Sequence, residues 1–82
     1  MVEIRFDKKF IQIFSKIKDR ILKLKIEKQI KKITENPNVG KPLRNIRRGT
    51  RELYIKPFRL SYKYDENEKV IYILDLYHKK FQ

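Results

Sequence analysis

The feature that most restricts how this chain can fold is a regular alternation of apolar and polar residues over positions 51–64. Apolar side chains recur at every second position, at Leu53, Ile55, Phe58, Leu60, Tyr62 and Tyr64. A period of two is that of a strand with one buried face, so this stretch predicts two short strands, 51–56 and 58–64. The other face and the turn are expected to carry cations, namely Arg51, Lys56, Arg59 and Lys63. Two interpretations stay open: a surface for a phosphate-rich partner, or edge charges that keep the sheet soluble and unpaired.

Net charge narrows the class of partner. The chain has 82 residues, with 22 Lys and Arg against 10 Asp and Glu, which gives a formal net charge of +12. A chain of this length is expected to form one domain, residues 1–82, because it is too short to bury two hydrophobic cores. Charge of this size attracts polyanions, and the partner could be a nucleic acid, an acidic protein or an anionic membrane surface.

The cysteine content and the hydropathy of the chain indicate the cellular compartment of the protein. The chain contains no cysteine, which excludes disulfides and thiolate metal sites and is typical of a reducing compartment. No apolar run approaches the roughly 20 residues of a membrane span. We therefore expect a soluble, cytoplasmic protein. No association with a membrane is expected either, because the apolar faces of the predicted helices are needed to cover the sheet and little would remain for lipid.

The N-terminal half is predicted to form a strand over 2–6 and two helices over 8–18 and 20–35. Asp7 and Asp19 are suitable N-caps, since a carboxylate can accept an orphan backbone N–H at the start of a helix. Each helix has one apolar stripe at a spacing of three or four residues, formed by Phe10, Phe14, Ile17 and Ile21 and then by Leu22, Ile26, Ile30 and Ile33. The many lysines opposite these stripes indicate a solvated face, with contact to a polyanion as the alternative.

The C-terminal half is predicted to complete a sheet. Residues 36–42 contain two prolines and a glycine, which end the second helix. Further strands are expected at 43–47 and 69–77, with 65–68 as the turn before the last one. The last strand is apolar on both faces, as a central strand would be. This order of elements predicts an α+β fold, with an N-terminal strand and a helix hairpin packed on a mainly antiparallel sheet of four or five strands.

Several short motifs at these positions resemble those of the RelE/ParE toxin superfamily, and the chain is most similar to RelE-type toxins of toxin–antitoxin systems. The motifs are Asn36-Pro37, Gly40, Leu43, Arg51-Glu52-Leu53, Phe58-Arg59-Leu60-Ser61-Tyr62, the aliphatic residues 70–74 and His78-Lys79. The aromatic-Arg-aliphatic-x-Tyr run at 58–62 is the most specific of them. The resemblance covers nearly the whole chain and implies a RelE-like toxin domain.

The resemblance implies a toxin of a type II toxin–antitoxin system. It implies a ribosome-dependent mRNA endonuclease that inhibits translation, with the ribosome and mRNA as partners. It also implies neutralisation by an acidic RelB-type antitoxin, with a heterotetramer as one form of the complex. Two alternatives stay open: a ParE-like toxin that inhibits DNA gyrase without being an enzyme, and a basic RNA-binding domain.

Site residues are carried over from the resemblance position by position. Arg59 matches the family arginine that follows an aromatic residue, Lys56 lies near its basic catalytic residues, and Lys79 stands where the family commonly has an arginine. These three are the candidate catalytic residues, and His78, Tyr54 and Tyr77 are secondary candidates. RelE enzymes often have a catalytic tyrosine a few residues beyond this point, and it is missing here, where Phe81 is the only aromatic residue. The basic residues expected to bind RNA are Arg44, Arg47, Arg48, Arg51, Lys63 and Lys80.

The chemistry of RNA cleavage supports the same residues. Cleavage without a metal uses the 2′-hydroxyl as an internal nucleophile, and it needs a base, cations on the phosphorane oxygens and an acid for the 5′-oxygen. Arg59 is suited to clamp the phosphate, because a guanidinium is always charged and binds two oxygens at once. Carboxylates are scattered along the chain and it has no glycine-rich phosphate loop, so neither a metal site nor a cofactor is predicted.

Overall fold

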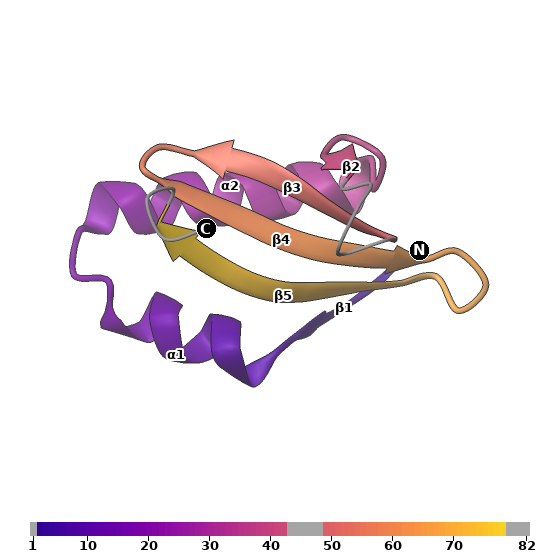
Figure 1. The fold of residues 1–82 in the computed structure, drawn as a ribbon, viewed down its shortest axis with the longest axis horizontal. Coiled ribbons are helices and arrows are strands. Elements are labelled where there is room, and N and C mark those ends of the chain that lie inside the picture. Colours follow the sequence, from indigo (N-terminus) through magenta and orange to yellow (C-terminus); the bar gives the residue numbers. More distant parts are fainter. Residues whose placement is uncertain (1, 43–48, 79–82) are drawn as a thin grey trace.

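The computed structural model describes residues 2–42 and 49–78, which form two helices and five strands of an α+β fold (Figure 1). The elements in chain order are β1 (Glu3–Phe6), α1 (Lys8–Lys16), α2 (Arg20–Glu35), β2 (Lys41–Pro42), β3 (Thr50–Ile55), β4 (Phe58–Asp65) and β5 (Val70–His78). Both predicted helices, and the strands predicted at 2–6, 51–56, 58–64 and 69–77, are confirmed to within two residues at each end. The strand predicted at 43–47 lies outside the described residues, and β2 just before it was not expected.

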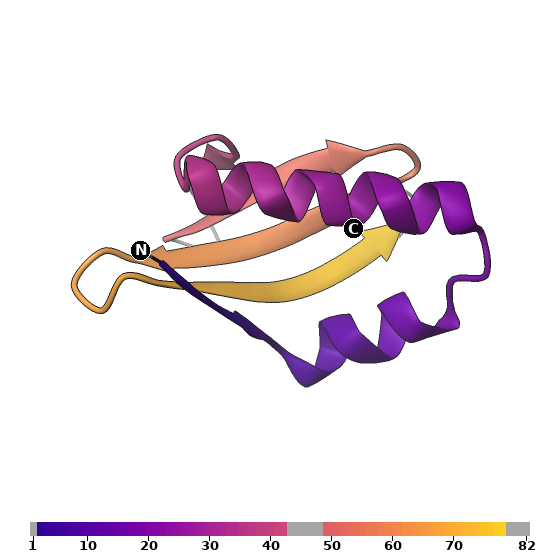
Figure 2. The same ribbon diagram turned by 180° about the vertical axis from the view of Figure 1, so that it is seen from behind.

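The strands form one sheet in the order β1-β5-β4-β3-β2. β1 pairs parallel with β5, and the other pairs are antiparallel, so the sheet is mainly antiparallel as predicted. α2 lies behind the sheet in Figure 1 and in front of it in Figure 2, which shows the molecule from the opposite side. α1 runs beside β5, beyond the end of β1. One face of the sheet is therefore covered by α2, and we call the opposite face the outer face.

Both helices begin at the predicted caps. The Asp7 carboxylate accepts a hydrogen bond from the Lys9 backbone N–H at 2.9 Å. The Asp19 carboxylate accepts from the N–H groups of Ile21 and Leu22 at 3.0 and 3.2 Å. α1 ends two residues earlier than predicted, because Ile17 is already extended and its N–H bonds to the Phe14 carbonyl. Those extended residues bring Asp19 into the backbone conformation that an N-cap requires.

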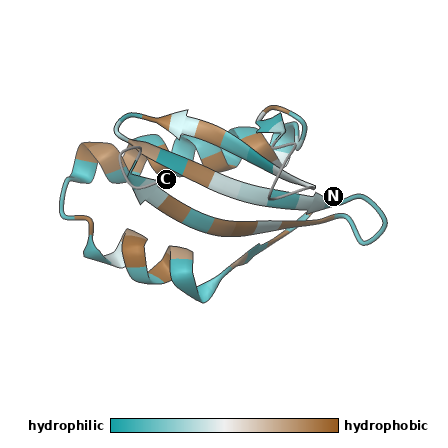
Figure 3. Ribbon diagram, in the orientation of Figure 1, coloured by the Kyte–Doolittle hydropathy of each residue, from teal (hydrophilic) through white to brown (hydrophobic). Residues whose placement is uncertain are grey.

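The hydrophobic core lies between the helices and the sheet face that they cover. Its buried residues are Phe10, Ile26, Ile33, Ile55, Leu60, Tyr62, Ile71, Ile73 and Leu76. Figure 3 shows the alternation of hydrophobic and hydrophilic residues along the central strands that produces this face. Burying this apolar surface is the main contribution to the stability of the domain.

A β-bulge in β5 explains its unusual run of apolar residues. Ser61 pairs with Asp75, whereas the next residue of β4, Tyr62, pairs with Ile73, so Leu74 is an extra residue. Ile73 and Leu76 can therefore both be fully buried in the core although they are three positions apart. β5 lies between β1 and β4, as the prediction of a central strand requires. Its apolar pattern, however, results in part from the bulge rather than only from burial of two faces.

The connection after α2 is fastened to the sheet by Tyr62. The buried Tyr62 hydroxyl accepts a hydrogen bond from the Gly40 N–H at 2.8 Å and donates one to the Pro37 carbonyl at 2.7 Å. A Cβ atom at position 40 would lie 2.7 Å from both the hydroxyl and a ring carbon of Tyr62, so the close approach requires glycine. Burial raises the pKa of Tyr62 above its ordinary value, which keeps the hydroxyl protonated for both bonds.

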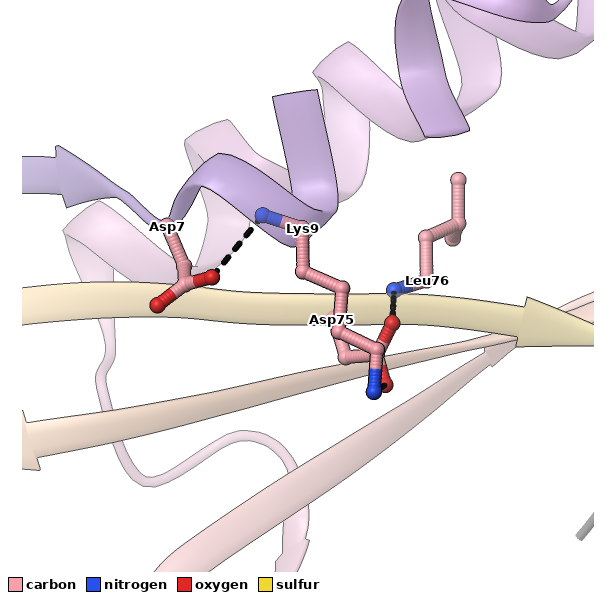
Figure 4. Close-up of polar contacts among 4 residues, drawn as sticks. All are labelled: Asp7, Lys9, Asp75 and Leu76. Carbon is pink, nitrogen blue, oxygen red and sulfur yellow. Dashed lines mark hydrogen bonds and ion pairs between the residues drawn. The ribbon is translucent and has the colours of Figure 1, made fainter. Parts of the chain in front are cut away.

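An ion pair joins α1 to β5 (Figure 4). The Lys9 ammonium lies 3.3 Å from the Asp75 carboxylate, and the other oxygen of this carboxylate accepts from the Leu76 N–H at 2.8 Å. Asp75 is buried, while Lys9 extends into solvent.

In the described part of the chain, neither helix has the length and hydropathy needed to cross a membrane.

Candidate functional site on the outer face

Strand pairing brings three of the predicted site residues into one row across the sheet. Arg59 of β4 pairs with Tyr54 of β3 on one side and with Tyr77 of β5 on the other. Paired residues project from the same face, with Cβ atoms roughly 4.5–5.5 Å apart. The next residue, Leu60, points into the core, so this row lies on the outer face. We call these three residues the Arg59 row.

The Arg59 guanidinium is held by an acidic side chain of the neighbouring strand. Its Nη1 atom donates to the Glu52 carboxylate at 3.0 Å. The Glu52 side chain is only 8% exposed, whereas the Arg59 side chain is 31% exposed. A carboxylate that has lost most of its water requires a cationic or hydrogen-bonding partner. The contact therefore gives the buried carboxylate a partner and holds one end of a guanidinium that still reaches the surface.

A buried polar row lies next to the Arg59 row. Ser61 pairs with Glu52 on one side and with Asp75 on the other, and all three residues are buried. Within residues 2–42 and 49–78, the Ser61 hydroxyl has no hydrogen-bond partner. No role was predicted for these three residues from the sequence. Their spacing in the sequence was the available signal for their position. Ser61 follows Arg59 by two positions and Glu52 precedes Tyr54 by two, so Ser61 and Glu52 lie on the same face as the Arg59 row.

Two further predicted cations lie near the Arg59 row. Lys63 is exposed, and it lies on the outer face because it pairs with Thr50 and Tyr72. Lys56 is exposed in the turn between β3 and β4, where the Lys56–Pro57 peptide bond is cis. The outer face and this turn thus carry three of the four cations that the sequence predicted there.

The prediction that Arg51 belongs to the outer face is wrong. Arg51 pairs with the core residue Tyr62, so it projects from the face covered by the helices. Its guanidinium donates to the backbone carbonyls of Gly40 and Asn38 at 2.8 and 3.2 Å. The physical reason is that side chains alternate between the two faces of a strand, so Arg51, two positions before the inward-facing Leu53, projects from the same face as Leu53. Arg51 supports the connection after α2.

The structure also separates His78 from the Arg59 row. His78 pairs with Phe58, and the two rings meet edge to face with centroids 5.7 Å apart. Because Phe58 packs against the core cluster, His78 lies on the opposite face from its neighbour Tyr77. The remaining predicted site residues lie outside the described residues, and they are Arg44, Arg47, Arg48, Lys79 and Lys80. Across the described ranges, no three His, Cys, Asp or Glu side chains gather in a way that could hold a metal ion.

Comparison with known proteins identifies the family. A family model described as the ParE toxin of the type II toxin–antitoxin system parDE matches residues 4–82. The chain therefore belongs to this family, and it is a type II toxin of the RelE/ParE superfamily, as its motifs predicted. None of the curated proteins compared with the chain matches it.

Solved structures of similar proteins share its fold. The chain is similar to the YoeB/ParE toxin from Agrobacterium tumefaciens, with a TM-score of 0.84, 14% identity and coverage of 94% of this chain and 98% of that one. It is similar to a chain of the RelBE2 toxin–antitoxin complex from Mycobacterium tuberculosis, with a TM-score of 0.80, 29% identity and coverage of 95% and 98%. For the intact RelBE complex of E. coli the TM-score is 0.78, with 16% identity and coverage of 93% and 94%. The two matches below 25% identity show that the fold is RelE-like.

Proposed function

We propose that this toxin is a metal-independent, ribosome-dependent mRNA endonuclease that inhibits translation. The observation that carries the proposal is the Arg59 row, in which a half-buried guanidinium lies between Tyr54 and Tyr77 on the outer face. A guanidinium binds two oxygens of a phosphate at once, and tyrosine rings provide surfaces on which bases stack. This combination suits a strand of RNA better than it suits a small ligand.

In the proposed reaction, the 2′-hydroxyl attacks the adjacent phosphate and the 5′-oxygen leaves. Arg59 stabilises the negative charge that develops on the phosphorane oxygens, and Lys56, in the exposed turn three residues earlier, adds positive charge. Lys79 is proposed as the third catalytic cation. The hydroxyls of Tyr54 and Tyr77 are proposed as the proton donor and acceptor, because both residues flank Arg59. His78 is less suited to this role, since it projects from the other face.

The RNA strand is proposed to continue over neighbouring cations. Lys63 lies on the same outer face, two residues further along β4 than the buried Ser61. The other proposed RNA-binding residues are Arg44, Arg47, Arg48 and Lys80. Arg51 is omitted from this surface because its guanidinium donates to backbone carbonyls.

The proposed protein partner is an acidic antitoxin of the RelB type, encoded beside the toxin and active in the same cytoplasm. Two of the similar structures are toxin–antitoxin complexes, from E. coli and M. tuberculosis. A net charge of +12 on 82 residues favours an acidic, extended segment that folds as it binds. The complex is proposed to include a heterotetramer, and the antitoxin is proposed to cover the outer face.

Inhibition of DNA gyrase is the second candidate function. It is favoured by the family model, which is described as a ParE toxin rather than as RelE. A gyrase inhibitor would need no catalytic groups, so the Arg59 row would then be a binding surface only. The two candidates predict different targets for the same purified chain.

Primer extension on translating ribosomes tests the proposal. The wild-type chain is expected to cut mRNA within the ribosomal A site, and Arg59→Ala should reduce the rate by about 100-fold or more, as loss of one charge-stabilising group does in other enzymes. Arg20→Ala is the matched control, because it removes an exposed arginine from the helical layer. Intact mRNA together with arrest of gyrase supercoiling would instead support the second candidate.

A further inference from the structure

Glu52 is the acidic side chain in direct contact with the proposed phosphate-binding arginine. It stands on β3, where it pairs with Ser61, while Arg59 pairs with Tyr54 two positions further along β3. Glu52 therefore reaches Arg59 diagonally across the strand pair, and Nη1 meets its carboxylate at 3.0 Å. Within residues 2–42 and 49–78, this is the one hydrogen bond or ion pair that the Glu52 side chain makes.

The position of this carboxylate is well defined. Glu52 is a residue of β3, and it is only 8% exposed. Its backbone also pairs with β2 on the other side, through Lys41. A carboxylate fixed in this way limits where the arginine can go, because the guanidinium is a rigid plane that must keep one terminal nitrogen at hydrogen-bond distance.

We propose that Glu52 is a positioning residue, which holds the Arg59 guanidinium in the orientation that contacts two oxygens of the RNA phosphate. The inference rests on the proposed RNA-cleaving function. Loss of the Glu52 contact would leave the guanidinium less ordered, and each turnover would then include part of the entropy of ordering the side chain. The rival explanation is that Glu52 and Arg59 pair only to neutralise a buried charge during folding.

The variant that separates these explanations is Glu52→Gln. Glutamine has the size of glutamate and keeps an oxygen that can accept from Arg59, but the charge that orders the guanidinium is lost. We expect kcat for ribosome-dependent cleavage to fall by about 10- to 100-fold, the range typical of residues that orient a functional group. The KM for ribosomes should stay within about 2-fold of wild type, because the exposed cations are unchanged. Glu27→Gln, an exposed glutamate of α2, is the matched control and should leave both constants unchanged.

A double-mutant cycle distinguishes a role of Glu52 through Arg59 from a purely structural role. If Glu52 acts through Arg59, adding Glu52→Gln to Arg59→Ala should reduce kcat no further. An equal additional loss in the Arg59→Ala background would overturn the inference. Unchanged kcat in a folded Glu52→Gln chain, alongside an active wild type, would also overturn it.

Two further outcomes are distinguishable. If the wild-type chain cleaves no mRNA, the proposed function fails and the inference falls with it. If Glu52→Gln does not fold, as judged by thermal unfolding, Glu52→Asp replaces it, because aspartate keeps the charge and withdraws the carboxylate by one methylene. The Glu52→Asp chain should then show a reduced kcat with KM close to that of wild type, and a wild-type kcat would overturn the inference.

Discussion

Replacing Tyr62 by phenylalanine is expected to destabilise the domain strongly although it removes one atom. The Tyr62 hydroxyl makes two hydrogen bonds to the connection after α2, from the Gly40 N–H at 2.8 Å and to the Pro37 carbonyl at 2.7 Å. Gly40 is buried, so its N–H cannot turn to bulk water when the hydroxyl is absent. The ring itself stays in place, and the effect therefore isolates the polar contacts.

The magnitude follows from those two contacts. A buried donor left without a partner costs about 1–3 kcal/mol, and the loss of the second, less buried bond adds about 1 kcal/mol. The free energy of unfolding should thus fall by about 2–4 kcal/mol. In a domain of this size, about 1 kcal/mol corresponds to a shift in Tm of roughly 4–8 °C, so Tm should drop by roughly 8–32 °C.

Thermal unfolding followed by circular dichroism measures this loss. Tyr64→Phe is the control, because Tyr64 packs against the same core cluster and its hydroxyl makes no hydrogen bond within the described residues. It should change the free energy of unfolding by less than about 0.5 kcal/mol. Equal Tm values for Tyr62→Phe and Tyr64→Phe would refute the reasoning.

Three other predictions concern stability. Burial raises the folded pKa of Tyr62 above its unfolded value of 10.0, so the contribution of its hydroxyl to stability is complete below pH 10 and is lost as pH rises through the folded pKa. In urea titrations above pH 10, wild type should lose more stability than Tyr62→Phe, and parallel curves would contradict this. Gly40→Ala should cost about 1–3 kcal/mol in urea unfolding, since its Cβ would lie 2.7 Å from the buried Tyr62, and an unchanged midpoint would exclude the clash. Lys9→Ala should cost about 1 kcal/mol by removing the partner of Asp75, and less at 1 M salt; a loss independent of salt would point to packing instead.

Local patterns in the sequence predicted most of the fold. Asp7 and Asp19 cap their helices as expected, because capping depends on a few neighbouring residues. The alternation over residues 51–64 predicted β3 and β4, because the period of side-chain direction is a property of the strand itself. The same alternation also indicated the correct face of Arg51, because Arg51 lies two positions before Leu53 and therefore projects from the same face.

Register and burial could not be predicted in the same way. The bulge at Leu74 is defined by which residue of β4 each residue of β5 meets, and this long-range pairing has no local signature. The burial of Glu52 was missed because glutamate is seldom buried without a partner, and its partner Arg59 became visible only when β3 and β4 were paired. For the same reason Tyr54, Arg59 and Tyr77 were predicted as separate candidates, and the structure joins them into one row.

The measurement that tests the proposed mRNA cleavage most directly uses a modified messenger. Ribosomes are programmed with two mRNAs that differ only in a 2′-O-methyl group at the nucleotide where the wild-type toxin cuts, and the fragments are analysed by mass. Cleavage through the 2′-hydroxyl predicts that the unmodified mRNA yields a fragment with a 2′,3′-cyclic phosphate or a 3′-phosphate, and that the methylated mRNA stays intact. Equal cleavage of both mRNAs, or cleavage of neither by a toxin that stops gyrase, would contradict the account.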